Sequence, residues 1–405
     1  MNTTLRRPSD IYSPLYFLAS LGSGGLVVTF FMYLLFWVPH KDKPVPTFEN
    51  LMAIFTTENL TLQVAIVIAM TGIAIFSFLN IRLLIWNFRA LSNFAQTADF
   101  QNLRASNGET TLLAGPLASA MTINALFIFG LVFVPKLWTV VEYLFPAALV
   151  AFLAIGIWAL NLIGAFLGRV LTKGGLFDVT ANNSFAQLLP AFALSMVAVG
   201  LAAPAAMSNS SVTVAASLIL STFFGTAAIL YTIIAATTAF TSMLQFGTAR
   251  EAGPTLMVII PILTVLGITF LRQNHGMHSS FDAHTSTGET MIFLARLLAV
   301  QILFLLLGVL VLRRQGYFND FVFGKKTSPG SYALVCPGVA LSVMLSFFIN
   351  KGLVATQIIT KFGLVYWSLT GLALVAQFLM IALIVILNRQ HFSTPKLGRK
   401  FLPAE

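Results

Sequence analysis

The chain has 405 residues, of which 58% are hydrophobic and only 9% are charged. A water-soluble domain usually carries about 25% charged residues, so this composition excludes an ordinary soluble protein. The net charge of +10 does not indicate nucleic-acid binding, because the basic residues lie in short loops between apolar runs and form no stripe. The single cysteine, Cys336, excludes an intrachain disulfide.

Ten apolar segments follow one another along the chain. Each is long enough to cross a hydrocarbon core of about 30 Å as a helix. The sequence therefore predicts an all-α integral membrane protein in which residues 13–390 form the ten-helix domain. Residues 1–12 and 391–405 are expected to be cytoplasmic segments. The predicted spans are 13–37, 63–87, 112–134, 138–168, 185–206, 211–245, 253–271, 289–312, 329–349 and 363–387.

The basic residues predict the orientation. We call the membrane side that carries residues 1–12 the N-terminal side and the other the opposite side. Of the 23 Lys and Arg residues, 16 fall on the N-terminal side, six on the opposite side and one, Arg296, inside a span. The positive-inside rule then places both termini in the cytoplasm and the chain in the cell (inner) membrane. The six on the opposite side are Lys41, Lys43, Lys136, Arg272, Lys351 and Lys361.

Helix breakers alternate along the spans. Every odd-numbered span contains glycine or proline at a point where a helix would be interrupted, whereas among even-numbered spans only the fourth has a proline, Pro146. Freed backbone groups are costly in lipid unless protein or a water-filled cavity receives them. The pattern predicts five helical hairpins around a central pore lined by the odd-numbered helices. The breakers are Gly24 and Gly25 in the first span, then Pro116, Pro190, Pro261 and Pro337.

Several stretches resemble the slow-type anion channel, tellurite-resistance and dicarboxylate transporter family, over about residues 14–391. They are NIRLLIWNFRAL, LGRVLTKGGLFDVTANNSFAQLLPAFALSMVAVGLAA, SMLQFGTAREAGPTLMVIIP with TFLRQNHG, and SYALVCPGVALSVM. The resemblance implies five hairpins around a pore, usually as a homotrimer. It also implies a pore-blocking phenylalanine where this chain has Cys336. Either the pore is less occluded, or another aromatic fills it; the candidates are Phe192, Phe17, Phe347 and Phe348.

The predicted function is transport of small anions. The odd spans, as bounded above, hold no charged residue in their interiors, whereas a cation channel would show an acidic ring. Helix N-termini carry partial positive charge, so a neutral pore among them favours anions. The leading hypothesis is a passive anion channel with a neutral pore. The alternative is a secondary carrier, possibly proton-coupled, that exports a dicarboxylate, sulfite or related oxyanion. A third possibility is a scaffold or sensor without transport.

The remaining ionisable residues do not indicate a catalytic or metal-binding site. Arg296 and Glu142 lie on even spans, and Arg296 with Glu289 is expected to form a structural pair or an interfacial anchor. The segment HGMHSSFDAH reads as a solvated loop, because the spacing of its histidines and Asp282 fits no zinc signature. No nucleotide-binding or hydrolase motif is present, so neither an enzyme nor a cofactor is expected. The expected partners are small anions, the lipid bilayer and further copies of the chain.

Overall fold

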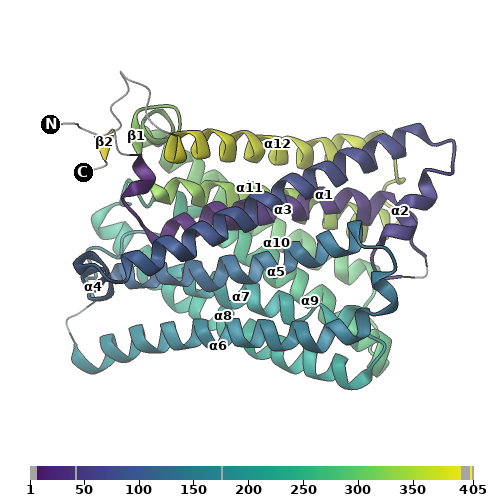
Figure 1. Cartoon of the computed structure of the whole chain (residues 1–405), viewed down its shortest axis with the longest axis horizontal. Coiled ribbons are helices and arrows are strands. Elements are labelled where there is room, and N and C mark those ends of the chain that lie inside the picture. Colours follow the sequence, from purple (N-terminus) through teal and green to yellow (C-terminus); the bar gives the residue numbers. More distant parts are fainter. Residues whose placement is uncertain (1–6, 42, 175–176, 394–401, 404–405) are drawn as a thin grey trace.

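A computed structural model describes residues 7–41, 43–174, 177–393 and 402–403. Within these residues, ten helical segments are long and apolar enough to cross a membrane, which confirms the predicted number (Figure 1). Nine of the predicted spans match these segments within about seven residues at each end. The seventh does not, because it runs over Gly253–Phe281 and so ends ten residues beyond the predicted end at 271.

The long helices are α1 (Phe17–Trp37), α3 (Leu60–Phe94), α5 (Ala114–Phe133), α6 (Val141–Lys173), α7 (Leu189–Leu201), α8 (Ser211–Phe246), α9 (Ile259–Phe281), α10 (Thr287–Arg314), α11 (Val335–Phe347) and α12 (Leu364–Phe392). Two short helices, α2 (Phe48–Ile54) and α4 (Ala98–Arg104), lie at opposite ends of the molecule (Figure 1). The strands β1 (Lys326–Thr327) and β2 (Leu402–Pro403) pair in parallel over two residues each.

Short 3₁₀ and π helices complete the chain. The 3₁₀ helices are η1 (Pro8–Asp10), η2 (Pro14–Tyr16), η3 (Asn107–Leu113), η4 (Leu137–Thr139), η5 (Phe185–Leu188), η6 (Pro204–Ala206), η7 (Gly253–Met257) and η9 (Pro329–Leu334). The π helices are η8 (Phe318–Val322) and η10 (Phe348–Val354), and η10 directly continues α11.

Each odd-numbered span begins with a 3₁₀ helix on the N-terminal side, so the five are built alike. These helices are η2, η3, η5, η7 and η9, and each contacts two others so that they close a ring. Four of them start at a serine whose hydroxyl accepts a hydrogen bond from the backbone N–H two residues later, which satisfies a donor that the helix leaves open. These serines are Ser13, Ser106, Ser184 and Ser328, whereas η7 starts at Ala252 without such a cap.

The prolines of the odd spans lie in the first turn of their α-helices. Pro190 is the second residue of α7, and Pro116, Pro261 and Pro337 are the third residues of α5, α9 and α11. Proline is tolerated there, because the N–H groups of a first helical turn have no partner within the helix. The expectation that these prolines break the helices inside the membrane is therefore wrong. They mark where a 3₁₀ turn gives way to an α-helix.

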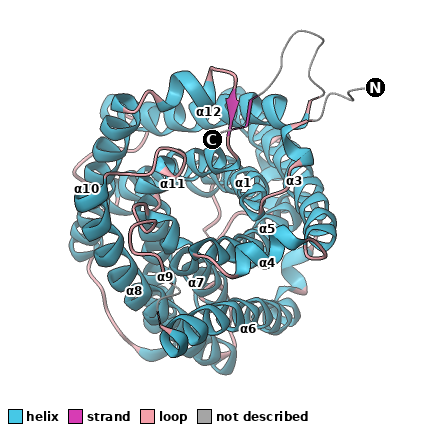
Figure 2. Cartoon of the chain, turned by 90° about the vertical axis from the view of Figure 1, so that its left-hand side faces the viewer, coloured by secondary structure: helices cyan, strands magenta, loops and turns pink. Residues whose placement is uncertain are grey.

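The odd-numbered spans are the inner ones. In the most apolar stretch of each odd span, between 56% and 94% of the residues are buried, against 22% to 39% in the even spans. Helix α1 contacts α5 and α11, α7 contacts α5 and α9, and α9 contacts α11, so these five helices close a ring. Figure 2 shows this inner ring from the N-terminal side, with α6, α8, α10 and α12 outside it. Each outer helix packs on the inner helix that precedes it.

The glycines of α1 permit close packing within the ring. A Cβ atom on Gly22 would lie 2.9 Å from Val335 Cγ1, and one on Gly25 would lie 2.8 Å from Val339 Cγ1. A Cβ on Gly24 would lie 2.9 Å from the Asn80 side-chain nitrogen on α3. Carbon atoms do not approach this closely, so each position needs glycine for α1 to seat against its neighbours. Gly24 therefore serves the contacts of α1 with α3 and also with α5, where the same Cβ would lie 2.8 Å from Met121 Cγ.

Candidate functional site

A large cavity lies inside the ring of five helices. Its volume is about 930 Å³, and its wall is formed mainly by α1, α5, α7, α9 and α11, with the loops at their C-terminal ends. None of its lining residues belongs to the 3₁₀ helices of the N-terminal side. The cavity therefore ends inside the ring on the N-terminal side and extends to the mouth formed by the loops of the opposite side.

Four of the predicted pore residues line the inner part of this cavity. They are Gly25, Phe192, Pro261 and Cys336, each within the first or middle turns of its helix. Phe192 and Cys336 expose only 3% and 8% of their surface, so both are packed rather than free in open space. The other predicted residues, Gly24, Pro116, Pro190 and Pro337, are absent from the lining.

Two of the four candidate phenylalanines contribute to the wall, at different depths. Of the four candidates for an occluding aromatic, Phe192 and Phe347 line the cavity, whereas Phe17 and Phe348 do not. Phe192 belongs to the first turn of α7 and shares the inner end with Cys336 on α11. Phe347 is the last residue of α11 and lies nearer the mouth. Phe192 is thus the aromatic that can close the inner end where Cys336 is too small to do so.

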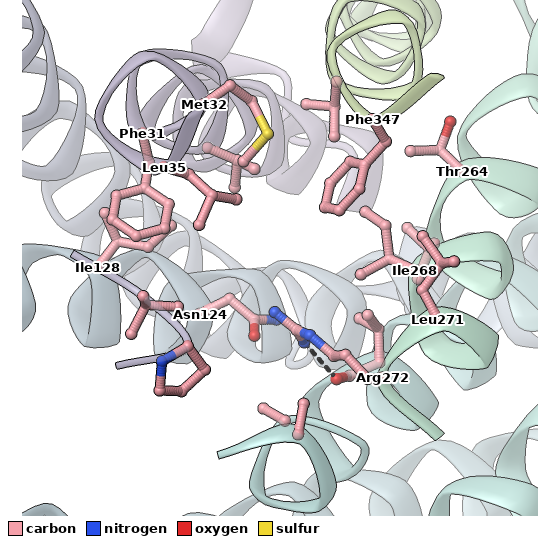
Figure 3. A pocket seen from close by; sticks show the side chains of 18 of the residues that line it. Phe31, Met32, Leu35, Asn124, Ile128, Thr264, Ile268, Leu271, Arg272 and Phe347 are labelled. Carbon is pink, nitrogen blue, oxygen red and sulfur yellow. Dashed lines mark hydrogen bonds between the residues drawn. The ribbon is translucent and has the colours of Figure 1, made fainter. Parts of the chain in front are cut away.

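Arg272 is the main correction to the sequence analysis. The sequence predicts Arg272 in a loop of the opposite side and no charged residue inside the odd spans. The structure places Arg272 within α9, where its side chain lines the cavity (Figure 3). Its guanidinium donates a hydrogen bond of 2.7 Å to the backbone carbonyl oxygen of Val199 on α7. Figure 3 shows the Asn124 side chain reaching toward this guanidinium from α5.

Two other polar side chains of the cavity wall, Thr264 and Asn350, are already engaged within the protein. The Thr264 hydroxyl lies 3.2 Å from the carbonyl oxygens of Ile260 and Ala340, and it accepts a hydrogen bond of 2.8 Å from Gln301. The Asn350 amide donates to the Ser346 carbonyl oxygen and accepts from a tyrosine hydroxyl. These hydrogen bonds connect the helices to one another. They leave few free donors or acceptors on these side chains for a ligand.

The mouth of the cavity is basic. Lys41, Lys351 and Lys361 line it, as do three histidines and Lys43, which is paired with Glu49 at 3.9 Å. No Asp or Glu is among the lining residues that the structure describes. Five of the six basic residues of the opposite side therefore surround one cavity, with Lys136 as the exception. Their charge makes the cavity and its entrance electropositive.

Burial and neighbouring charges affect the titratable groups of this mouth. Desolvation lowers the pKa of His40 below its ordinary value of 6.5, and the positive charges of Lys351 and Lys361 lower it further, against a hydrogen bond to the Val38 carbonyl that raises it. Desolvation also lowers the pKa of Lys361. His40 is therefore neutral at neutral pH and gains its charge only in acid.

The ionisable residues of the even spans lie outside the cavity. The Glu142 carboxylate accepts hydrogen bonds of 2.8 Å from the Ser208 hydroxyl and 2.7 Å from the Asn209 backbone N–H, which ties the start of α6 to the loop before α8. Arg296 is exposed on α10. Glu289 accepts from Ser286 in a helix cap and forms no ion pair with Arg296, so the predicted pair is not present.

The segment HGMHSSFDAH is mostly helical. Helix α9 continues to Phe281, so the expectation of a solvated loop from the first histidine onward is wrong. His275 and His278 line the cavity mouth as a result. Among the residues that the structure describes, no group of three or more His, Cys, Asp or Glu is placed to hold a metal ion.

Sequence reasoning missed Arg272 because the predicted span stopped at the first charged residue. Little in the sequence argues against that end, because the next residues include types that commonly occur where a helix ends. They are Arg272, Asn274, His275 and Gly276. Only the absence of a proline before Phe281 allowed the helix to continue. A charged residue inside a span marks a functional position more often than it marks the end of the span.

A scan against protein-family models and a search of curated proteins found no match to the chain. The resemblance to the slow-type anion channel, tellurite-resistance and dicarboxylate transporter family therefore stays an expectation that rests on the motifs quoted above.

Proposed function

We propose that this protein passes small anions across the membrane along the axis of its inner ring of five helices. The observation that carries the proposal is the cavity of about 930 Å³ inside that ring, because the charged residues that line it, among those the structure describes, are all basic. A cation pathway would need acidic or carbonyl ligands at its narrow part, whereas basic residues attract anions and repel cations. The resemblance to an anion-transporting family supports the same reading.

The basic lining replaces the neutral pore expected from the sequence. The inner helices end on the opposite side, where the partial negative charge of their C-termini would repel an anion. Lys41, Lys351, Lys361 and Arg272 reverse the sign of that end. The cavity ends at the level of Phe192 and Cys336, so we interpret this conformation as open to the opposite side and closed toward the N-terminal side.

Proteoliposomes provide the test. We expect purified protein to pass chloride or nitrate down a gradient while it excludes sodium and potassium. A triple substitution, Lys41→Gln with Lys351→Gln and Lys361→Gln, should lower anion flux several-fold, whereas Lys136→Gln is the matched control on the same side. Equal flux of cations, or full anion flux in the triple variant, would contradict the proposal.

A secondary carrier is the second candidate, and Arg272 is the observation that favours it. A carrier holds its substrate at a fixed site between two closures, and this cavity has one closed end and a cation on the inner helix α9. A channel gives fast flux that rises linearly with concentration, whereas a carrier gives saturable flux and counterflow. Measurement of flux over a wide concentration range, with a counterflow assay, separates the two.

We also infer that the chain forms a homo-oligomer in the cell membrane, a trimer if the family resemblance holds. The exposed Arg296 on α10 supports an oligomer, because a charged side chain facing lipid is unfavourable unless a second copy or the membrane surface receives it. Native mass spectrometry of the protein in mild detergent tests the state directly. A single monomer peak at all concentrations would contradict this inference.

A further inference from the structure

The wall around Arg272 is mainly apolar, although the Asn124 side chain reaches toward the guanidinium from α5. In Figure 3 the guanidinium reaches into a space bordered by aliphatic and aromatic side chains from α1, α5, α9 and α11. A charged group in such surroundings is stable only with a counter-charge or with several hydrogen bonds. The labelled apolar residues of this wall are Phe31, Met32, Leu35, Ile128, Ile268, Leu271 and Phe347.

Among the residues that the structure describes, one acceptor is hydrogen-bonded to Arg272. A guanidinium has five N–H donors, and the structure gives Arg272 one bond, to the neutral carbonyl oxygen of Val199. No carboxylate among the described residues lies within ion-pair distance of Arg272. The hydrogen bond from Arg272 on α9 to Val199 on α7 uses one of the five donors. It leaves the positive charge of Arg272 without a counter-charge among the described residues. A group outside the described residues, either water or a ligand in the cavity, is therefore left to balance this charge.

The position of Arg272 separates it from the basic residues of the rim. Lys41 and Lys361 belong to loops outside the membrane spans, whereas Lys351 lies in η10, three residues before the end of the ninth candidate span. Arg272 lies nine residues before the end of α9, so it is not one of the basic residues that commonly end a helix. The part of the cavity around it thus holds one fixed positive charge and a large apolar surface.

We propose that this part of the cavity binds organic monocarboxylates, with the carboxylate on the Arg272 guanidinium and an apolar body against the wall from α1 and α11. This inference deepens the proposed function and rests on it. The planar guanidinium matches a carboxylate, because two parallel N–H groups meet two oxygens, a pairing that a halide cannot make. A second carboxylate on the ligand would lie against the apolar wall without a partner, so dicarboxylates bind less well than monocarboxylates of similar size.

The test is binding of benzoate to the purified full-length protein in detergent, measured by isothermal titration calorimetry at pH 7.5. We expect benzoate to bind at least tenfold more tightly than succinate or chloride. Arg272→Gln should weaken benzoate binding at least tenfold. Arg272→Lys, which keeps the charge and loses the paired donors, should weaken it less. Arg296→Gln is the matched control, since it removes an arginine from a span without touching the cavity.

Thermal unfolding without ligand establishes which variants are folded. If Arg272→Gln is not folded, the benzoate affinity of Arg272→Lys tests the proposal. Unchanged benzoate affinity in a folded Arg272 variant, or chloride binding as tight as benzoate binding, would overturn the inference. Nitrate flux in liposomes keeps the two proposals apart. Flux without benzoate binding removes this inference and leaves the proposed function, whereas Arg272-dependent binding without flux of any anion removes the proposed function.

Discussion

At the scale of single residues, the mouth of the cavity carries a group that responds to pH. His40 lies among the lining residues near Lys351 and Lys361, and burial together with those two charges lowers its pKa from 6.5. The imidazole is therefore neutral at pH 7.5, and it gains its charge only as the pH falls below its ordinary value. An added positive charge at the entrance raises the local anion concentration, with screening over about 8 Å at physiological salt.

We expect anion uptake from the opposite side to rise about twofold between pH 7.5 and pH 5.5 through His40. His275 and His278 also line the mouth, so the quantity to compare is the difference between the wild-type protein and His40→Gln in proteoliposomes. The variant should match the wild-type flux at pH 7.5 and fall below it in acid. Identical pH profiles would show that His40 does not act on the anion.

The single cysteine offers a second test at this scale. Cys336 lines the inner end of an electropositive cavity, so a negatively charged thiol reagent should reach it more readily than a positively charged one of equal size. We expect a sulfonate-bearing methanethiosulfonate to modify the protein several-fold faster than its trimethylammonium counterpart, after correction for their rates with free thiol. Mass spectrometry measures the modification, and Cys336→Ser should show none. Faster reaction of the cationic reagent would mean that the cavity is not electropositive.

At the scale of the elements, the five inner helices are held together by close contacts at small residues. Gly22 faces Val335 at the start of α11, and a Cβ atom there would lie 2.9 Å from Val335 Cγ1 and 3.2 Å from its Cβ. Val335 is fully buried, so its side chain cannot move aside without displacing α11. A single added methyl group therefore acts on the whole contact between two inner helices.

We expect Gly22→Ala to lower the free energy of unfolding by about 1–3 kcal/mol, since overpacking a tight contact costs that much. Addition of Val335→Ala should restore part of the loss, because it removes the nearest methyl groups. Gly164→Ala on α6 is the control, as a Cβ there would meet no atom within 4 Å. Thermal or denaturant unfolding in detergent measures all three. A loss in Gly164→Ala as large as in Gly22→Ala would contradict the packing argument.

The membrane spans could be predicted well from the sequence, because a span is recognised by the length and hydrophobicity of an apolar segment. The alternation of inner and outer helices was also readable, since Pro190, Pro261 and Pro337 recur at the same place in successive odd spans. The structural role of those prolines could not be read from the sequence. A proline in the first turn of a helix cannot be told from one in the middle unless the residue at which the helix begins is known. Arg272 was missed for a related reason, since a hydropathy pattern cannot tell the end of a span from a charge that faces a cavity.

At the scale of the whole molecule, an even number of spans puts both ends of the chain on one side. The ten candidate spans and the excess of basic residues beside the termini together predict that this side is the cytoplasm. A fluorescent protein fused to the C-terminus should be fluorescent, whereas a phosphatase that is active only outside the cytoplasm should be inactive there. The reverse pair of results would mean that the cavity opens to the cytoplasm.

The five inner helices all begin on the N-terminal side, so they run in the same direction around one axis. Their aligned peptide dipoles add instead of cancelling, and the ring is therefore electrically polar along the path that an ion would take. An anion that moves toward the N-terminal side approaches the positive ends of these dipoles, and one that moves out leaves them. We therefore expect rectification: in a planar bilayer with equal salt on both sides, the current should differ in size when the voltage is reversed.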